Sequence, residues 1–205
     1  MNTYPTPAII KETSNGYFQL SLLDELLSKR EIYCLGEINS NSTSSLILQL
    51  KYLEQVDPDA EITLYINSPG GSVADGLALY DIMQNLSCPI HTICMGTAAS
   101  FGAILFLSGD KREILPHSKI MIHDPLIAGS GLTGSATLLH TQIDSLMETR
   151  EILANIIAKH TKKTIEEIYE KTATDTWFNA TQAIEFGLAD NIITNKKEEK
   201  ENTNE

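Results

Sequence analysis

The sequence predicts an α/β fold built on parallel strands. Short runs rich in β-branched residues alternate with segments of helical spacing along the middle of the chain, and this alternation is typical of strand–helix units that share one sheet. The chain has 205 residues, of which 42% are hydrophobic and 20% charged, so it can bury the core of one domain.

The elements of the N-terminal half follow from this pattern in order. Strands are expected at 32–35, 62–66 and 90–94, each followed by a helix, over about 43–55, over about 73–86 and from near residue 100 to before residue 109. The first of these helices should end at Asp57-Pro58, because the residue before a proline disfavours helical backbone. Two further strands are expected around 113–115 and 119–122.

The C-terminal half is predicted to be mainly helical. A long helix is expected from after Gly134 to about residue 159, because its apolar residues recur at helical spacing. Two capping boxes predict the starts of two later helices, at Thr164 with Glu167 and at Asn179 with Gln182.

The two ends of the chain are expected to lack regular structure. Prolines and the Asn15-Gly16 pair interrupt residues 1–16, which predicts an irregular segment. Residues 195–205 are almost wholly polar, which is typical of a disordered charged tail. Residues 17–194 remain as one domain without an internal linker.

Composition and charge exclude several classes of function. The net charge of −12, with only 15 Lys and Arg residues, argues against nucleic acid or an anionic membrane surface as a partner. No apolar run approaches the ~18 residues of a membrane span, and the first residues do not resemble a signal peptide, so a cytoplasmic location is expected. The three cysteines show no CxxC spacing; we expect neither a disulfide framework nor a zinc site, and Cys34 and Cys94 should be small core residues.

Two segments suggest chemistry. In Asn67-Ser68-Pro69-Gly70-Gly71-Ser72, paired glycines between a strand and a helix let backbone N–H groups approach and hold an oxyanion, although a plain tight turn explains the same residues. In the segment 96–103, Ser100 lies where a strand gives way to a helix of small residues, and the partial positive charge of a helix N-terminus suits a nucleophile. The GxSxG pattern is absent, and a helix cap is the alternative interpretation of Ser100.

His123 is the histidine best placed to serve as a base for such a serine. It ends an apolar strand and precedes Asp124-Pro125, and a strand end can deliver a side chain to a cleft; a surface histidine is the alternative. Ordinary explanations suffice for the other four, which fall in a strand, a turn and two helix surfaces: His91, His117, His140 and His160. Spacing alone cannot select an orienting carboxylate from 27 acidic residues.

Together, the segments 65–73, 96–102 and 115–125 resemble the signature segments of the ClpP family, the proteolytic subunits of ATP-dependent Clp proteases. The resemblance covers about residues 5–194. It implies an α/β fold of the ClpP/crotonase type, a spiral of ββα units with a protruding handle helix at about 126–160.

The resemblance also implies a mechanism. Ser100 would be the nucleophile, His123 the general base and Asp175 the acid that orients it, while the backbone N–H groups of Gly70 and Phe101 would form the oxyanion hole. The chain would then be a serine endopeptidase that cuts unfolded proteins to short peptides through an acyl-enzyme, without a metal or organic cofactor.

Partners follow from the same resemblance. Family members form heptameric rings that stack in pairs, and an AAA+ Clp unfoldase ATPase feeds unfolded chains into the barrel. The N-terminal residues would line the axial pores. Tyr52 and Tyr65 match apolar positions of the pocket that receives the docking loops of the ATPase; core aromatics are the alternative interpretation.

Four departures from the family pattern suggest a divergent paralogue. Ala173 and Thr174 replace an Asp-Arg pair before the acid, and a Thr cannot make the bidentate contact that an Arg makes across the ring–ring interface. The turn 109–112 is two residues shorter, 127–134 is about three residues longer and rich in glycine, and 18–24 differ from the family's aromatic-rich N-terminal helix. We therefore expect a weak or conditional peptidase when the protein is alone.

Two other functions stay open. A crotonase-type enzyme acting on an acyl-CoA thioester would share the glycine-turn oxyanion hole and would need no Ser–His–Asp set. A non-catalytic or conditional subunit would act in a mixed ring with a second ClpP paralogue, although the right residue types at all three triad positions argue against a non-catalytic role.

Overall fold

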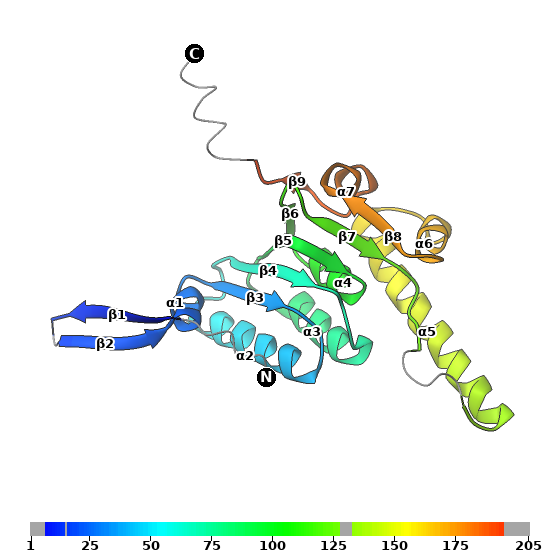
Figure 1. Ribbon diagram of the computed structural model, residues 1–205, viewed down its shortest axis with the longest axis horizontal. Coiled ribbons are helices and arrows are strands. Elements are labelled where there is room, and N and C mark those ends of the chain that lie inside the picture. The colour runs from blue at the N-terminus through cyan, green and yellow to red at the C-terminus, as the bar shows by residue number, and fades with distance from the viewer. Residues whose placement is uncertain (1–6, 15, 128–132, 195–205) are drawn as a thin grey trace, which may run out of the picture.

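The computed structural model describes residues 7–14, 16–127 and 133–194 (Figure 1). A seven-stranded, mostly parallel sheet with helices packed against it confirms the predicted α/β class. The sheet strands are β3 (Glu31–Leu35), β4 (Ile62–Ser68), β5 (Ile90–Ala99), β6 (Lys111–Ile114), β7 (Lys119–Ile122), β8 (Thr176–Asn179) and β9 (Asn191–Ile192).

The long strand β5 organises the sheet. Strands β3, β4, β5, β6 and β9 run parallel in that order. The first half of β5 pairs with β6, and its second half, at Thr97–Ala99, pairs in parallel with β7. Strand β8 then pairs antiparallel with β7, so the site described below lies where this antiparallel pair joins the parallel sheet.

The helices begin and end close to the predicted positions. They are α1 (Leu22–Ser28), α2 (Ser40–Val56), α3 (Val73–Asn85), α4 (Phe101–Leu107), α5 (Ala136–Thr161), α6 (Ile165–Thr172) and α7 (Ala180–Phe186). Both predicted capping boxes are present, at the starts of α6 and α7. Helices α2, α3, α4 and α5 pack side by side in that order, and every residue of α4 is buried. The core therefore surrounds the helix that Ser100 precedes.

The N-terminal prediction needs a correction, because part of the segment expected to be irregular is a strand. β1 (Ala8–Thr13) and β2 (Gly16–Ser21) form an antiparallel hairpin, with Thr13 paired to Gly16. Gly16 explains the difference, because its φ of +117° lets the chain reverse directly between the two strands. The predicted charged tail at 195–205 lies outside the described residues.

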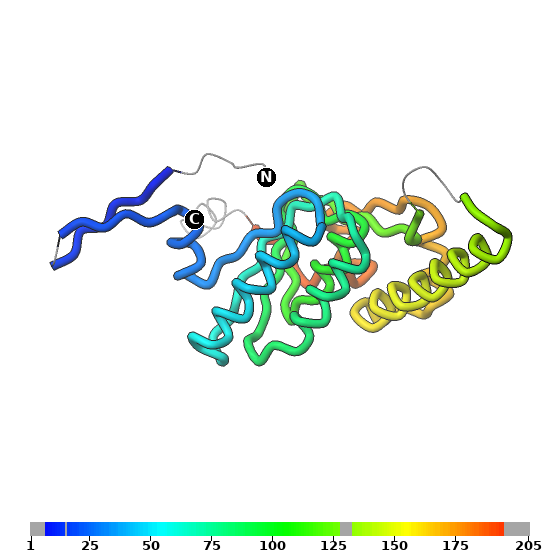
Figure 2. The backbone as a smooth tube through the Cα atoms, turned by 90° about the horizontal axis from the view of Figure 1, so that it is seen from below, coloured from blue at the N-terminus to red at the C-terminus, as the bar shows by residue number. Residues whose placement is uncertain are grey.

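Two elements extend away from the sheet. Figure 2 shows the β1–β2 hairpin at one end of the molecule and the free end of α5 at the other. Helix α5 has 26 residues and covers the long helix predicted after Gly134, while residues 128–132 of the predicted handle fall outside the described ranges. Within those ranges, no helix is both long enough and apolar enough to cross a membrane.

Candidate active site

Ser100 lies between β5 and the start of α4 in a backbone conformation that few side-chain-bearing residues adopt. Its φ is 54° and its ψ is −123°, and its N–H donates to the carbonyl of Met121 on β7. Such a conformation costs about 1–3 kcal/mol and is held by the surrounding structure. The side chain makes no capping hydrogen bond to α4; instead, Oγ lies 2.8 Å from Nε2 of His123.

His123 and Asp175 come together because of the register between β7 and β8. The last pair of this antiparallel ladder is Ile122 opposite Thr176, so the next positions along it are His123 and Asp175. Nδ1 of His123 lies 3.0 Å from Oδ1 of Asp175. The histidine side chain is 16% exposed and the aspartate side chain 65%, so the imidazole is held between a buried serine turn and a carboxylate that faces solvent.

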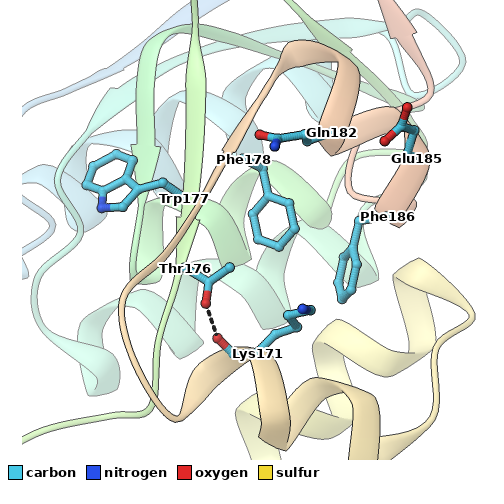
Figure 3. A pocket seen from close by; sticks show the side chains of 7 residues that line it. All are labelled: Lys171, Thr176, Trp177, Phe178, Gln182, Glu185 and Phe186. Atoms are coloured by element: carbon cyan, nitrogen blue, oxygen red, sulfur yellow. Dashed lines mark hydrogen bonds between the residues drawn. The ribbon is translucent and has the colours of Figure 1, made fainter.

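The loop that carries Asp175 is also fixed from its far side. The Thr176 hydroxyl donates to the Lys171 carbonyl at 2.6 Å, which ties the start of β8 to α6 (Figure 3). A shallow cavity of about 320 Å³ lies beside this contact. Its lining contains none of Ser100, His123 and Asp175, and consists of Lys171, Thr176, Trp177, Phe178, Gln182, Glu185 and Phe186.

A larger cleft of about 660 Å³ opens over Ser100 and His123. Most of its walls are apolar, and two of its lining residues, Leu153 and Ile157, come from α5. The remaining lining residues are Glu37, Pro69, Gly71, Ser72, Val73, Phe101, Ile104, Met121, Ile122, Pro125 and Leu126. An extended apolar segment of a peptide fits the chemistry of these walls better than a charged metabolite.

The glycine turn after β4 presents one free N–H group to this cleft. The N–H of Gly70 donates to the Ser68 hydroxyl at 3.1 Å, and Gly70 is buried against Ser100. Gly71 lines the cleft, and its N–H donates to no acceptor within the described residues. The N–H of Phe101 is at the first position of α4, where no intrahelical acceptor exists. In this turn the N–H of Gly71 is therefore free of an acceptor within the described residues, whereas the N–H of Gly70, which the resemblance implied for the oxyanion hole, is bonded to Ser68.

The other histidines lie away from the cleft. His117 is in a turn and His91 is in β5, as expected, and His140 is an exposed residue of α5 paired with Asp144. His160 is not simply a surface residue of α5, because Nε2 lies 3.1 Å from the Tyr80 hydroxyl. Burial, with the nearby charges of Lys159 and Arg112, lowers the pKa of His160 to about 4.

The cysteines and the two predicted docking tyrosines also have defined surroundings. Cys34, Cys88 and Cys94 are buried free thiols, as expected for Cys34 and Cys94, and burial raises the pKa of Cys34 to about 11 and that of Cys94 to about 12. Tyr52 is 55% exposed on α2, and half-buried Tyr65 stacks on Tyr33 at 4.8 Å between ring centroids, so neither is a core aromatic. In the described part of the chain, no three His, Cys, Asp or Glu side chains are grouped so as to hold a metal ion.

A family model described as Clp protease matches residues 14–196. The chain belongs to the Clp protease family. The match spans all the sheet strands and all the helices of the structure, and the mostly parallel sheet agrees with the ClpP fold predicted from the sequence. As a member of the Clp protease family, the chain is a peptidase of the ClpP type.

Their places at strand ends made Ser100 and His123 candidates, with a helix cap and a surface histidine as the alternatives, whereas their roles, and Asp175 itself, came only from the resemblance. No spacing signal identifies Asp175, because it reaches His123 through the pairing of β7 with a strand more than 50 residues later. Gly71 could have been found from the Gly-Gly pair only by knowing which of the two N–H groups the Ser68 hydroxyl occupies.

Proposed function

We propose that this member of the Clp protease family is a serine endopeptidase that uses Ser100, His123 and Asp175. The observation that carries the proposal is the position of His123, whose two ring nitrogens lie within hydrogen-bond distance of Ser100 and Asp175. A base held between a nucleophile and an orienting carboxylate is the arrangement that activates a serine hydroxyl.

The geometry supports a two-step reaction. Nε2 of His123 takes the proton from Ser100 Oγ as Oγ attacks the peptide carbonyl, and the oxyanion receives the N–H groups of Gly71 and Phe101. The C–N bond then breaks, and His123 passes the proton to the departing amine. Water, deprotonated by the same imidazole, hydrolyses the ester and restores Ser100. Asp175 holds the tautomer of His123 and stabilises its charged form.

Covalent labelling of Ser100 by a fluorophosphonate probe tests this mechanism directly. Wild-type protein should be labelled at Ser100, Ser100→Ala should not be labelled, and Asp175→Asn should be labelled about 10⁴-fold more slowly. Asp144→Asn is the matched control, because it alters the other His–Asp pair, on the exposed surface of α5, and should label at the wild-type rate. Equal labelling of Asp175→Asn and Asp144→Asn would remove Asp175 from the mechanism.

We further propose that the chain assembles into stacked heptameric rings that receive unfolded proteins from an AAA+ Clp ATPase in the cytoplasm. Exposed apolar side chains in two places support assembly. On α2, Leu48, Tyr52 and Val56 follow one another at helical spacing. On α5, they are Leu138, Ile143, Met147 and Ile152.

Two measurements test the assembly. The native mass should correspond to 14 chains, or to 7 where the rings separate, and Tyr52→Asp should abolish ATPase-dependent degradation of a folded substrate while leaving the labelling of Ser100 unchanged. A monomeric mass with full peptidase activity, or a Tyr52→Asp variant that still degrades the substrate, would contradict this part of the proposal.

A conditional role in a mixed ring is the second candidate, because Ala173 and Thr174 place no charged side chain beside Asp175. Mixing with a second ClpP paralogue should then raise the activity of this chain, and Ser100→Ala should remove that increment. The family match argues against the crotonase-type alternative, which predicts acyl-CoA turnover without labelling of Ser100.

A further inference from the structure

Asp124, the residue after His123, makes more contacts than a strand exit requires. Its N–H donates to the Thr172 carbonyl at 2.7 Å, and its Oδ1 accepts the Thr172 hydroxyl at 2.5 Å. Its Oδ2 accepts Nε of Arg150 at 2.7 Å. One side chain thus joins the end of β7 to the end of α6 and to the middle of α5.

These contacts bracket the pair formed by His123 and Asp175. On one side, the β7–β8 ladder ends with Ile122 opposite Thr176. On the other side, Asp124 is bonded to Thr172 through both backbone and side chain. Two sets of hydrogen bonds, at the end of the β7–β8 ladder and between Asp124 and Thr172, therefore join the segment that carries His123 to the segment that carries Asp175. His123 and Asp175 can separate only if one of these two sets breaks.

The segment between Thr172 and Asp175 has few other contacts. Ala173 donates its N–H to the Tyr169 carbonyl, and the Thr174 carbonyl accepts a long 3.3 Å bond from the Thr176 hydroxyl. Neither residue has a charged side chain that could anchor Asp175. The position of this exposed carboxylate therefore depends on the hydrogen bonds that hold Thr172 to Asp124 and Thr176 to β7.

Arg150 connects the Asp124–Thr172 contacts to helix α5. Its guanidinium lies 4.0 Å from the centre of the Tyr169 ring on α6 while its Nε binds Asp124. The Arg150 and Asp124 side chains are 25% and 31% exposed, so the ion pair is better shielded than one on the open surface. A planar guanidinium can stack on the ring and donate to the carboxylate at once, which a lysine ammonium cannot do.

We propose that Asp124, held by Thr172 and Arg150, is a positioning residue that keeps Asp175 in register with His123. This inference rests on the proposed function of Ser100, His123 and Asp175. Asp124 does not touch the reacting atoms; it acts through the two segments that carry the base and the acid. Because Arg150 belongs to α5, the alignment of the site also depends on where the handle helix lies.

The test compares Asp124→Asn and Thr172→Val with wild type by the maximal rate and the apparent affinity of fluorophosphonate labelling. Each variant should lower the maximal labelling rate by about 10- to 100-fold, the effect of a small misplacement of catalytic groups, while the apparent affinity for the probe changes less than about twofold. Asp175→Asn should lower the maximal rate as well, by about 10⁴-fold.

Asp190→Asn is the matched control for a purely structural effect. Asp190 also accepts an arginine Nε and a backbone N–H, both from Arg112, but it is not among the residues that line the cleft. This variant should lose thermal stability as Asp124→Asn does, and should keep the wild-type labelling rate and probe affinity.

The outcomes distinguish a failure of the positioning role from a failure of the proposed function. If wild-type Ser100 is labelled while Asp124→Asn and Thr172→Val keep its maximal labelling rate, the positioning role is wrong and the proposed function stands. If wild type is not labelled at all, the proposed function fails, and the positioning role fails with it. If Asp124→Asn does not fold, Thr172→Val decides alone, because it removes one hydroxyl and leaves the backbone bond of Asp124 in place.

Discussion

Replacing Gly70 with alanine should displace Ser100, because the two residues are in direct contact. Gly70 has a φ of +94°, and a Cβ built on it would lie 2.7 Å from the Ser100 Cβ, 2.8 Å from the Ala99 carbonyl oxygen and 2.9 Å from the Phe101 nitrogen. Each of these distances is shorter than real Cβ contacts allow, and two of the three atoms belong to the backbone. The strain can be relieved only by moving the turn that carries the nucleophile.

The structure sets the magnitude. A left-handed backbone costs an L-residue about 1–2 kcal/mol, and overpacking a rigid site adds about 1–3 kcal/mol, so Gly70→Ala should lower the free energy of unfolding by about 2–5 kcal/mol. A shift of about 1 Å in Ser100 should slow its labelling by about 100-fold.

Gly36→Ala separates backbone strain from collision. Gly36 has a φ of +87°, but nothing lies within 4 Å of its missing Cβ. Denaturant unfolding of this variant should show a loss of about 1–2 kcal/mol with unchanged labelling of Ser100. If Gly70→Ala and Gly36→Ala are equally stable and equally labelled, the close contact between Gly70 and the serine turn does not control the nucleophile.

Three other measurements test the surroundings of individual groups. The pKa of His160 is lowered to about 4 from an ordinary 6.5, so the unfolded chain takes up a proton at a higher pH than the folded protein does. The stability that the neutral ring gives is therefore complete above pH 6.5 and is lost as the pH falls toward 4. That loss is at most about 3 kcal/mol and nearer 2 for a half-buried ring, and urea unfolding from pH 7 to 4.5 should show it in wild type but not in His160→Gln. The raised pKa values of Cys34 and Cys94 predict slow alkylation at pH 8 until denaturant is added, and rapid native alkylation of either thiol would contradict their burial. Burial and the Glu31 carboxylate raise the pKa of Tyr33 to about 12, so an ultraviolet titration should find one phenol fewer ionising above pH 11 in Tyr33→Phe than in wild type.

Local signals predicted the elements of this fold well. The capping boxes at Thr164 and Asn179 mark the true starts of α6 and α7, since each depends only on residues within one helical turn. The same locality explains why Ser100 and His123 could be selected from the sequence, because each follows directly from the end of a strand.

The sequence could not predict contacts that depend on pairing between distant segments. Asp175 reaches His123 through the register of β7 with β8, and Asp124 reaches Thr172 at the end of α6; no nearby pattern marks either of them among the acidic residues. The choice between Gly70 and Gly71 turns on a single hydroxyl, that of Ser68. The hairpin at the N-terminus was missed for a different reason, since the glycine that follows its turn was interpreted as a break in structure.

The antiparallel pairing of β7 with β8 has a consequence for biosynthesis. A nascent chain that ends within α5 already contains Ser100, His123 and nearly all of the parallel sheet, but it lacks the strand that brings Asp175 to the imidazole. Because domains generally fold as units, the three side chains of the proposed triad come together only once β8 has been made and has paired with β7. In the proposed mechanism, nucleophile activation thus waits for a strand that is synthesised well after the serine itself.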